Sequence, residues 1–224
     1  MADEFDPSGM NGAAAAVIED IIRRRRSIRR YKHDPLPAPW IESMLQCAHQ
    51  APSPSNSQPV RYIRIDAPEC RDKLRRAFID GHARFIVKHK AAGGSAKLRN
   101  WINAYKRFAE FMYEAPVLLA VGVTTQTLGF SGRLAEAGLL ERDMRQNTDL
   151  DMTVGLALSG LMLKAQALGV GSCILTAPLV FIDAPEQLLA LNDIKIKCFV
   201  TLGLADEVPS PTSRKPLTDV VRVI

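Results

Sequence analysis

The chain has 224 residues, of which 47% are hydrophobic and 24% are charged, and its formal net charge is +5. This balance is typical of a folded globular protein and excludes a largely disordered or low-complexity chain. The positive charge leaves anionic small molecules and nucleic acid as candidate partners.

The cysteines and the N-terminus indicate the compartment. The four cysteines lie far apart and form no CxxC pair, so neither a zinc site nor a disulfide scaffold is predicted. The acidic N-terminus lacks the basic and apolar regions of a secretory signal. The longest uncharged apolar run, residues 154–163, is shorter than the roughly 20 residues that span a bilayer. We therefore predict a soluble, cytoplasmic protein with no membrane partner.

Apolar periodicity and prolines divide the chain into helices and strands. Apolar residues recur at helical spacing in some segments, whereas short apolar or β-branched runs indicate strands. Prolines set several boundaries, because the residue before a proline is pushed out of the α region. The predicted helices run from about 13 into the arginines at 23–26, from the prolines at 35–39 to 51, onward from 68, over 95–113, over 152–168 and over 185–191. The predicted strands are 60–65, 116–123, 169–175 and 194–204.

The remaining segments are predicted to be irregular. Residues 1–12 are acidic and lack periodicity, which predicts a disordered leader ahead of a single domain at 13–224. Residues 52–59 form a turn-rich loop, and 124–147 form a surface excursion or flexible lid. The basic stretch at 81–94 is less periodic, and the sequence assigns it no structure. No polar linker divides the chain, so we predict one α+β domain in which the apolar helix at 152–168 backs a small sheet.

An arginine-rich segment follows the first predicted helix. Arg25, Arg26 and Arg29 flank a single hydroxyl in the sequence. That hydroxyl belongs to Ser27, and guanidinium groups around it suit a phosphate monoester and a polar ring edge. A solvated basic helix end is the commoner interpretation of such a run. Nucleic-acid binding is a weaker one, because no stacking aromatics are interleaved with the arginines.

A second polar segment lies in the predicted loop at 52–59. Its hydroxyl and amide groups can hydrogen-bond a heterocycle without adding charge, although such stretches are usually plain turns. The groups concerned are Ser53, Ser55, Asn56 and Gln58.

The order and spacing of the two segments resemble a known signature. Arg-Arg-Ser-x-Arg, then about two dozen residues, then Ala-Pro-Ser-x-x-Asn-x-Gln-Pro and a strand, resembles the flavin-binding pattern of the nitroreductase family. The segments at 168–173, 202–205 and 214–217 resemble its glycine turn, its final core strand and its basic C-terminal phosphate contact. The resemblance spans residues 18–220, and it is weak at 70–115 and at 124–150. It implies a small central, mostly antiparallel sheet flanked by helices, in an intertwined homodimer that holds FMN between its subunits.

The resemblance also implies a role for each candidate residue. Arg25 and Ser27 would hold the FMN phosphate together with Arg214, with help from Arg26 and Lys215. Arg29 would lie at the pyrimidine edge, where a cation stabilises negative charge on the reduced flavin. Backbone amides near Leu175 and Thr176 would approach the flavin atom N5. The partner subunit would line the ribityl chain and ring with Ser53, Ser55, Asn56 and Gln58.

The activity implied by the resemblance is a ping-pong oxidoreductase. NADH or NADPH would give hydride to the flavin and leave, and a nitroaromatic, quinone or similar small oxidant would then take its place. No catalytic side chain or metal is required, and the histidines are scattered. The aromatic residues proposed to stack over the flavin, with core packing the commoner fate of each, are Phe85, Trp101, Phe108, Phe111 and Tyr113.

Three alternatives stay open. Some relatives dehalogenate aromatic compounds or fragment the flavin, although the intact Asn-x-Gln-Pro argues mildly against fragmentation. A flavin-binding relative without activity toward NAD(P)H is a second. A basic nucleic-acid-binding module is the third, and it would leave the loop at 52–59 unexplained.

Overall fold

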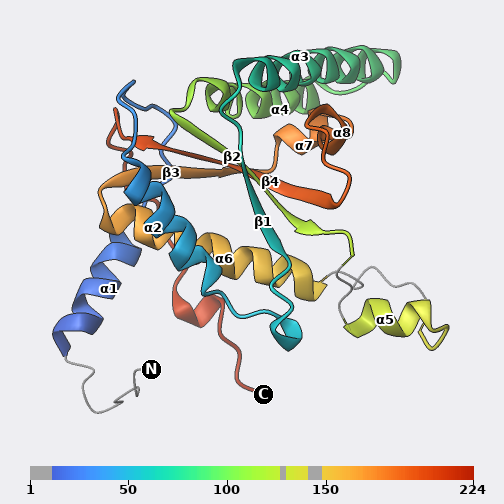
Figure 1. Ribbon diagram of the computed structural model, residues 1–224. Helices are drawn as coiled ribbons and strands as arrows, with labels where there is room; N and C mark the ends of the chain where they lie inside the picture. The colour runs from blue at the N-terminus through green and yellow to red at the C-terminus, as the bar shows by residue number, and fades with distance from the viewer. Residues whose placement is uncertain (1–11, 127–129, 141–147) are drawn as a thin grey trace.

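The computed structural model describes residues 12–126, 130–140 and 148–224 (Figure 1). The predicted leader, apart from Gly12, and parts of the predicted lid lie outside the described residues. The described helices are α1 (Gly12–Arg24), α2 (Ala38–His49), α3 (Pro68–Ala91), α4 (Ala96–Arg107), α5 (Phe130–Glu136), α6 (Thr148–Ala167), α7 (Pro178–Phe181) and α8 (Pro185–Leu188), with the short 3-10 helices η2 (Pro54–Asn56), η3 (Glu110–Glu114) and η4 (Leu217–Asp219). The described strands are β1 (Val60–Arg64), β2 (Val117–Thr124), β3 (Val170–Leu175) and β4 (Ile194–Leu204).

The four strands form one sheet in the order β1-β2-β4-β3, and each neighbouring pair is antiparallel. The central strands β2 and β4 are buried along nearly their whole length. A strand covered on both faces has no polar side to present, which explains the wholly apolar run at 116–123. The predicted α+β fold with a small antiparallel sheet is therefore confirmed.

Helices cover both faces of this sheet (Figure 1). Side chains of β2 alternate between the two faces, as they do in any strand. Leu119 and Val121 pack with α2 and the central helix α6, whereas Leu118 and Ala120 pack with α3, η3 and α7. The predicted role of the apolar helix is confirmed, because α6 forms the backing of one face. None of the described helices combines the length and apolarity that crossing a membrane requires.

One predicted boundary between the first and second strands was wrong. The basic stretch at 81–94, which the sequence left unassigned, belongs largely to α3, because this helix continues to Ala91. Helix α4 ends at Arg107 instead of continuing to 113, and the chain then tightens into η3. The change in path brings Met112 and Tyr113 into the core beneath α3. A further short helix, α7, was not predicted.

One buried carboxylate ties α8 to the sheet and has a consequence for acid stability. Glu186 Oε1 accepts the Ile196 backbone N–H at 2.9 Å and lies 3.2 Å from Lys195 Nζ. Burial raises the pKa of Glu186, but hydrogen bonds from backbone amides and from Lys195 outweigh burial and hold it below its ordinary 4.5. A lowered pKa in the folded chain stabilises it above the ordinary value, and this stabilisation is lost as the pH falls through the folded pKa.

We therefore expect Glu186→Gln to reduce the free energy of unfolding by about 1 kcal/mol near neutral pH. The difference from the wild type should shrink as the pH falls below the ordinary glutamate value. Urea unfolding at about pH 7 and about pH 3.5 measures both quantities. A difference that stays constant with pH would show that the charge on Glu186 contributes nothing.

Candidate functional site

The first predicted motif lies across one corner of the sheet, where β3 and β4 meet. The Ile28 backbone N–H donates to Ser172 O at 3.0 Å, and Ser27 bridges Ser172 in parallel register. Farther along, Tyr31 bridges Ala205. Backbone pairing with β3 at one end and with the residue after β4 at the other therefore sets the position of the segment 27–31.

Two glycines make room for this segment. Gly171 on β3 and Gly203 on β4 are register partners. A Cβ atom at Gly171 would lie 2.9 Å from Ile28, and one at Gly203 would lie 2.8 Å from the Tyr31 ring. The glycines that the sequence singled out therefore form a flat patch on which residues 27–31 rest.

We expect Gly203→Ala to displace Tyr31, because the new methyl group would meet that ring and, at 3.0 Å, the Pro116 ring. Overpacking between two rigid rings costs about 1–3 kcal/mol. Urea unfolding measures this loss, and Gly12→Ala is the control, since a Cβ there meets nothing within 4 Å. Equal stability of the two variants would refute the close packing of Tyr31 on the sheet.

Three of the predicted phosphate and ring contacts lie on the segment beside a buried thiol. Ser27 pairs with Ser172, the residue before Cys173, and we call Arg25, Ser27 and Arg29 the cradle. Burial raises the pKa of Cys173, while the charges of Arg29 and Arg25 and a hydrogen bond with Ser27 act in the opposite direction. The sequence had identified Cys173 only as a buried thiol.

The arginines of the cradle differ from their neighbours in their ion pairing. Neighbouring arginines are paired, Arg23 and Arg24 with Asp20 and Arg30 with Glu207. Among the described residues, by contrast, Arg25 and Arg29 form no ion pair. Two unpaired guanidinium groups beside a hydroxyl are suited to binding an anion.

Glu207 fixes the backbone of the cradle, and sequence reasoning missed it. Its carboxylate Oε1 accepts the backbone N–H groups of both Arg29 and Arg30, the latter at 3.0 Å. The Arg29 guanidinium lies over the Phe108 ring, 5.8 Å from its centroid. Tyr31 donates its hydroxyl to Ile28 O at 2.6 Å. The only sequence signal for Glu207 was an acidic residue shortly after the final core strand.

The other predicted phosphate contacts are placed elsewhere. Arg26 donates to the carbonyl oxygens of Arg23 and Arg25, at 2.7 and 2.8 Å, and so caps the end of α1. Arg214 and Lys215 are exposed in the segment after β4, where Arg214 donates to Thr212 Oγ1 at 3.0 Å. Within the described part of the chain, neither forms a hydrogen bond or ion pair with the cradle.

The second predicted motif is a loop with an unusual backbone. Ser55, Asn56 and Gln58 have φ angles of 51°, 51° and 44°, in the left-handed region that non-glycine residues rarely adopt. Ser53 Oγ accepts the Gln58 backbone N–H at 2.9 Å, and Gln58 Nε2 donates to Asn56 Oδ1 at 3.2 Å. Ser55, Asn56 and Gln58 are exposed, and backbone strain of this kind is concentrated at binding sites.

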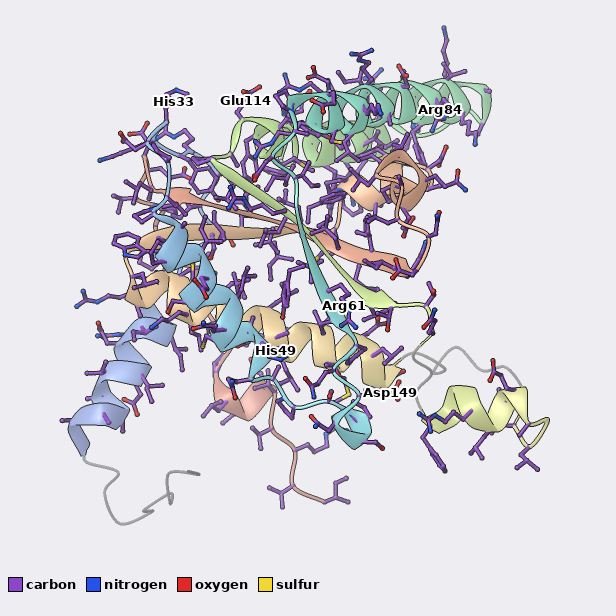
Figure 2. The ribbon with its side chains drawn as sticks, in the orientation of Figure 1. His33, His49, Arg61, Arg84, Glu114 and Asp149 are labelled. Atoms are coloured by element: carbon purple, nitrogen blue, oxygen red, sulfur yellow. The ribbon has the colours of Figure 1, made fainter. Side chains whose placement is uncertain are left out.

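The two motifs lie at diagonally opposite corners of the sheet. The loop precedes the edge strand β1, whereas the cradle lies on the other edge strand, β3. Through the register of the sheet, Val60 at the end of the loop lies level with Lys195 of β4, and Ser172 beside the cradle lies level with Leu202. Lys195 and Leu202 are separated by roughly 23 Å along β4, at 3.3 Å per residue. In Figure 2, His33, just beyond the cradle, and Arg61, just beyond the loop, are far apart. One chain therefore does not bring the two motifs together.

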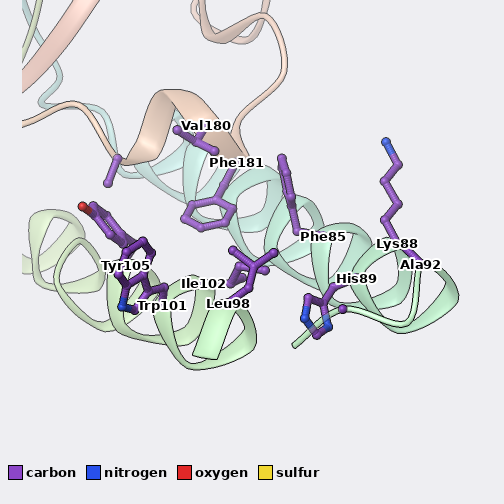
Figure 3. Close-up of a pocket in the computed structure, with 12 residues that line it drawn as sticks. Phe85, Lys88, His89, Ala92, Leu98, Trp101, Ile102, Tyr105, Val180 and Phe181 are labelled. Carbon is purple, nitrogen blue, oxygen red and sulfur yellow. The ribbon is translucent and has the colours of Figure 1, made fainter. Parts of the chain in front are cut away.

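Leu175 and Thr176 lead from the end of β3 into a pocket. Leu175 is buried, and the Thr176 carbonyl accepts the Leu179 N–H at 3.0 Å as α7 begins. The next residue, Ala177, borders a cavity of about 540 Å³ between α3, α4 and α7, which we call the aromatic pocket (Figure 3). Its lining residues are Phe85, Lys88, His89, Ala92, Gly94, Leu98, Trp101, Ile102, Tyr105, Ala177, Val180 and Phe181.

The five predicted stacking aromatics have different environments. Phe85 and Trp101 line the aromatic pocket. Phe108 lies under Arg29, and Phe111 contacts the Tyr31 ring, with centroids 6.3 Å apart. Tyr113 is buried in the core beneath α3. Among the described residues, His, Cys, Asp and Glu side chains do not gather in any group of three suited to a metal ion.

Comparison with known proteins identifies the family. The sequence profile of the nitroreductase family matches residues 22–204. A putative NAD(P)H nitroreductase of Bacillus subtilis, YfhC, is 27% identical over 91% of this chain and 92% of its own length. A 5,6-dimethylbenzimidazole synthase of Rhodospirillum rubrum is 31% identical over 75% of this chain and 71% of its own length. The crystal structure of a BluB-like flavoprotein from Clostridium difficile 630 has the same fold, with a TM-score of 0.76 at 21% identity, and covers 92% of this chain and 98% of its own. The chain belongs to the nitroreductase family.

Proposed function

We propose that the chain is an FMN-dependent oxidoreductase that uses NADH or NADPH to reduce a nitroaromatic, quinone or similar small oxidant by a ping-pong mechanism. The observation that carries the proposal is the cradle, where two arginines that form no ion pair among the described residues flank Ser27 beside β3, in a chain of the nitroreductase family. Bound FMN would supply N5, the atom that accepts hydride and passes it on. The proposed location is the cytoplasm, and the proposed partners include neither nucleic acid nor a membrane.

The chain's own residues fit an FMN phosphate. Arg25 and Ser27 offer charged and neutral donors to a dianion, and a phosphate would neutralise charge that is otherwise unpaired. Arg29, held by Glu207 through its backbone, would present its cation at the pyrimidine edge. A cation there stabilises the negative charge that develops on reduction, and a positioned cation acts without reorganisation.

The proposed site needs two copies of the chain. A flavin held by the cradle is out of reach of the loop in the same chain, because the two motifs occupy opposite corners of the sheet. We propose that the loop of a second copy supplies Ser53, Ser55, Asn56 and Gln58. In a symmetric dimer each copy would contribute a cradle to one site and a loop to the other.

Exposed apolar surface supports this dimer. Met152, Leu156 and the small Gly155 lie together on the uncovered face of α6. The segment after β4 carries Arg214 and Lys215 and runs past α6 to an exposed end (Figure 1). Arg214 and Lys215 would then reach a cradle from this segment only after assembly. Exposed apolar residues of α1 and the C-terminal segment are Val17, Ile18, Ile22, Leu217, Val220, Val221, Val223 and Ile224.

A visible spectrum of the purified protein, followed by anaerobic addition of NADH or NADPH, tests the proposal. A yellow protein that bleaches, and recovers its colour when a nitroaromatic or quinone is added, supports it. A yellow protein that does not bleach would indicate a different electron donor or a flavin-binding relative without this activity. A protein that stays colourless after incubation with FMN contradicts the proposal. Sedimentation at micromolar concentration tests the dimer separately.

Flavin fragmentation is a second candidate function, favoured by one comparison. The Rhodospirillum rubrum relative is named for 5,6-dimethylbenzimidazole, whose dimethyl-substituted benzene ring is also part of a flavin. The intact Asn56-x-Gln58-Pro59 favours the oxidoreductase instead. Incubating the reduced protein with oxygen and free FMN distinguishes the two, because fragmentation consumes flavin whereas the proposed oxidoreductase returns it unchanged.

A further inference from the structure

The aromatic pocket is preformed by ring contacts beneath it. Phe181 of α7 meets Phe85 of α3 edge to face, with centroids 5.6 Å apart and planes at 88°. On its other side Phe181 packs in the same manner against the buried Phe78, at 5.2 Å. These contacts fix the pocket floor, so the pocket does not depend on a ligand for its shape.

Helix α4 forms the wall of the aromatic pocket opposite α7. The turn between α3 and α4 sets the position of this helix. His89 Nε2 hydrogen-bonds Ser95 O at 2.9 Å, and Gly94 packs so closely that a Cβ there would meet the His89 ring. The Ser95 hydroxyl then accepts the Leu98 N–H at 3.2 Å and caps α4. The wall presents Trp101 to the cavity with 58% of its surface exposed.

The size and chemistry of the pocket suit one planar aromatic molecule. Ligand pockets measure about 300–1,000 Å³, and about 540 Å³ falls within this range. Phe85, Phe181 and Trp101 offer ring faces and edges, which favour another ring over an aliphatic chain. The pocket begins at Ala177, one residue after Thr176, so a ligand there would lie next to the segment proposed to approach N5.

The charged group at the pocket edge is basic. The lining includes Lys88 and no aspartate or glutamate. Lys88 forms no ion pair with any residue in the described ranges, whereas its neighbour Arg84 is paired with Asp183. Lys97 adds a second cation, 5.6 Å above the Trp101 ring. Figure 3 shows Lys88 at the end of the row that runs from Trp101 through Phe181 to Phe85.

We propose that the aromatic pocket selects a planar aromatic anion, such as an aromatic carboxylate that also bears a nitro or quinone group, and that the Lys88 ammonium attracts its negative charge. The proposal deepens the proposed function. Reduction of the ligand depends on that function, whereas binding of the ligand to the pocket does not. The apolar walls hold the ring, and the cation favours the anion over its neutral analogue. The pocket therefore defines a substrate class within the broader set of nitroaromatics and quinones.

Two probes of equal shape test the charge preference. The probes are 4-nitrobenzoate and the neutral 4-nitrobenzamide, and calorimetry measures their binding to the purified protein with its cofactor. We expect the anion to bind about fivefold more tightly at low salt, as an exposed ion pair allows, with the difference shrinking in high salt. Lys88→Met should reduce the preference to less than half, because Lys97 remains, and should leave the binding of the amide unchanged. Lys90→Met, on the same turn of α3 but outside the lining, is the matched control and should keep the preference.

A further variant tests whether the probes occupy this pocket. Trp101→Ala should weaken both probes about tenfold, because each loses a ring contact. Equal affinity of the two probes for the wild type, an unchanged preference in Lys88→Met, or unchanged binding in Trp101→Ala would each overturn the proposal. Failure of both probes to bind would also overturn it and would suggest that a second copy of the chain covers the groove. A higher KM for NADPH in Lys88→Met without any change for the probes would assign the lysine to the electron donor instead, which also overturns it.

Failure of the proposed function would look different. In the proposed function, flavin content and bleaching by NAD(P)H would depend on the cradle, and Lys88 lines the aromatic pocket instead. Charge-selective probe binding by a protein that cannot be loaded with flavin would support the pocket and contradict the oxidoreductase.

Discussion

Replacing Arg25 and Ser27 together by alanine is expected to yield a protein that purifies with little or no FMN. Each side chain would donate a hydrogen bond to a charged phosphate, and such a bond contributes about 1.5–3 kcal/mol. Loss of both corresponds to an affinity about 100- to 10,000-fold lower. Both residues are only partly buried and outside the apolar core, so the fold should persist.

The ratio of flavin to protein absorbance, with thermal unfolding as the check of folding, measures this effect. Arg23→Ala is the matched control, because Arg23 lies on the same basic run but is paired with Asp20. It should retain a full complement of flavin. Stoichiometric FMN in the Arg25→Ala, Ser27→Ala double variant would contradict the assignment of the cradle to the phosphate.

Mixing variants tests whether the site is shared between chains. A cradle variant and a loop variant, Asn56→Ala with Gln58→Ala, should each bind flavin poorly. In a dimer of one cradle variant and one loop variant, one site combines the altered cradle with the altered loop. The other site combines the unaltered cradle with the unaltered loop. Random exchange of subunits should therefore restore about a quarter of the sites. No recovery on mixing would show that each site is built by a single chain.

The largest loss of stability is expected from Phe78→Ala. Phe78 is fully buried and packs its ring against Tyr113 and Phe181, with centroids 5.9 and 5.2 Å away. Truncating a buried phenylalanine removes its transfer free energy and leaves a cavity, a loss of about 3–5 kcal/mol. Because Phe78 supports Phe181, the aromatic pocket should lose affinity for both probes as well.

Urea unfolding of the flavin-free protein measures the loss without a contribution from ligand binding. Ile79→Ala, one residue along α3, is the control, because 46% of Ile79 is exposed. Ile79→Ala should lower the free energy of unfolding by about 1 kcal/mol or less. Similar losses for the two variants would mean that α3 does not pack on the sheet as described.

Local chemistry accounts for the predictions that were confirmed. The run at 116–123 is wholly apolar because β2 is buried on both faces. A buried strand can therefore be recognised from this run alone, without knowing which segments pack against it. Prolines at 37 and 52 limited α2 correctly, because a proline acts on the residue beside it. The prediction for 95–113 failed where burial of Met112 and Tyr113, a tertiary effect, changed the path of the chain.

The side chains available for chemistry could be recognised from the order of residues, namely the arginines and hydroxyl of the first motif and the polar groups of the second. Their arrangement in space depends on how the chain folds. Glu207 reaches Arg29 across 178 positions of sequence, and Arg26 turns away to cap α1. The aromatic pocket joins α3, α4 and α7, and the register of the sheet separates cradle from loop. Periodicity reports only on residues a few positions apart, whereas these arrangements depend on contacts between segments that meet when the chain folds.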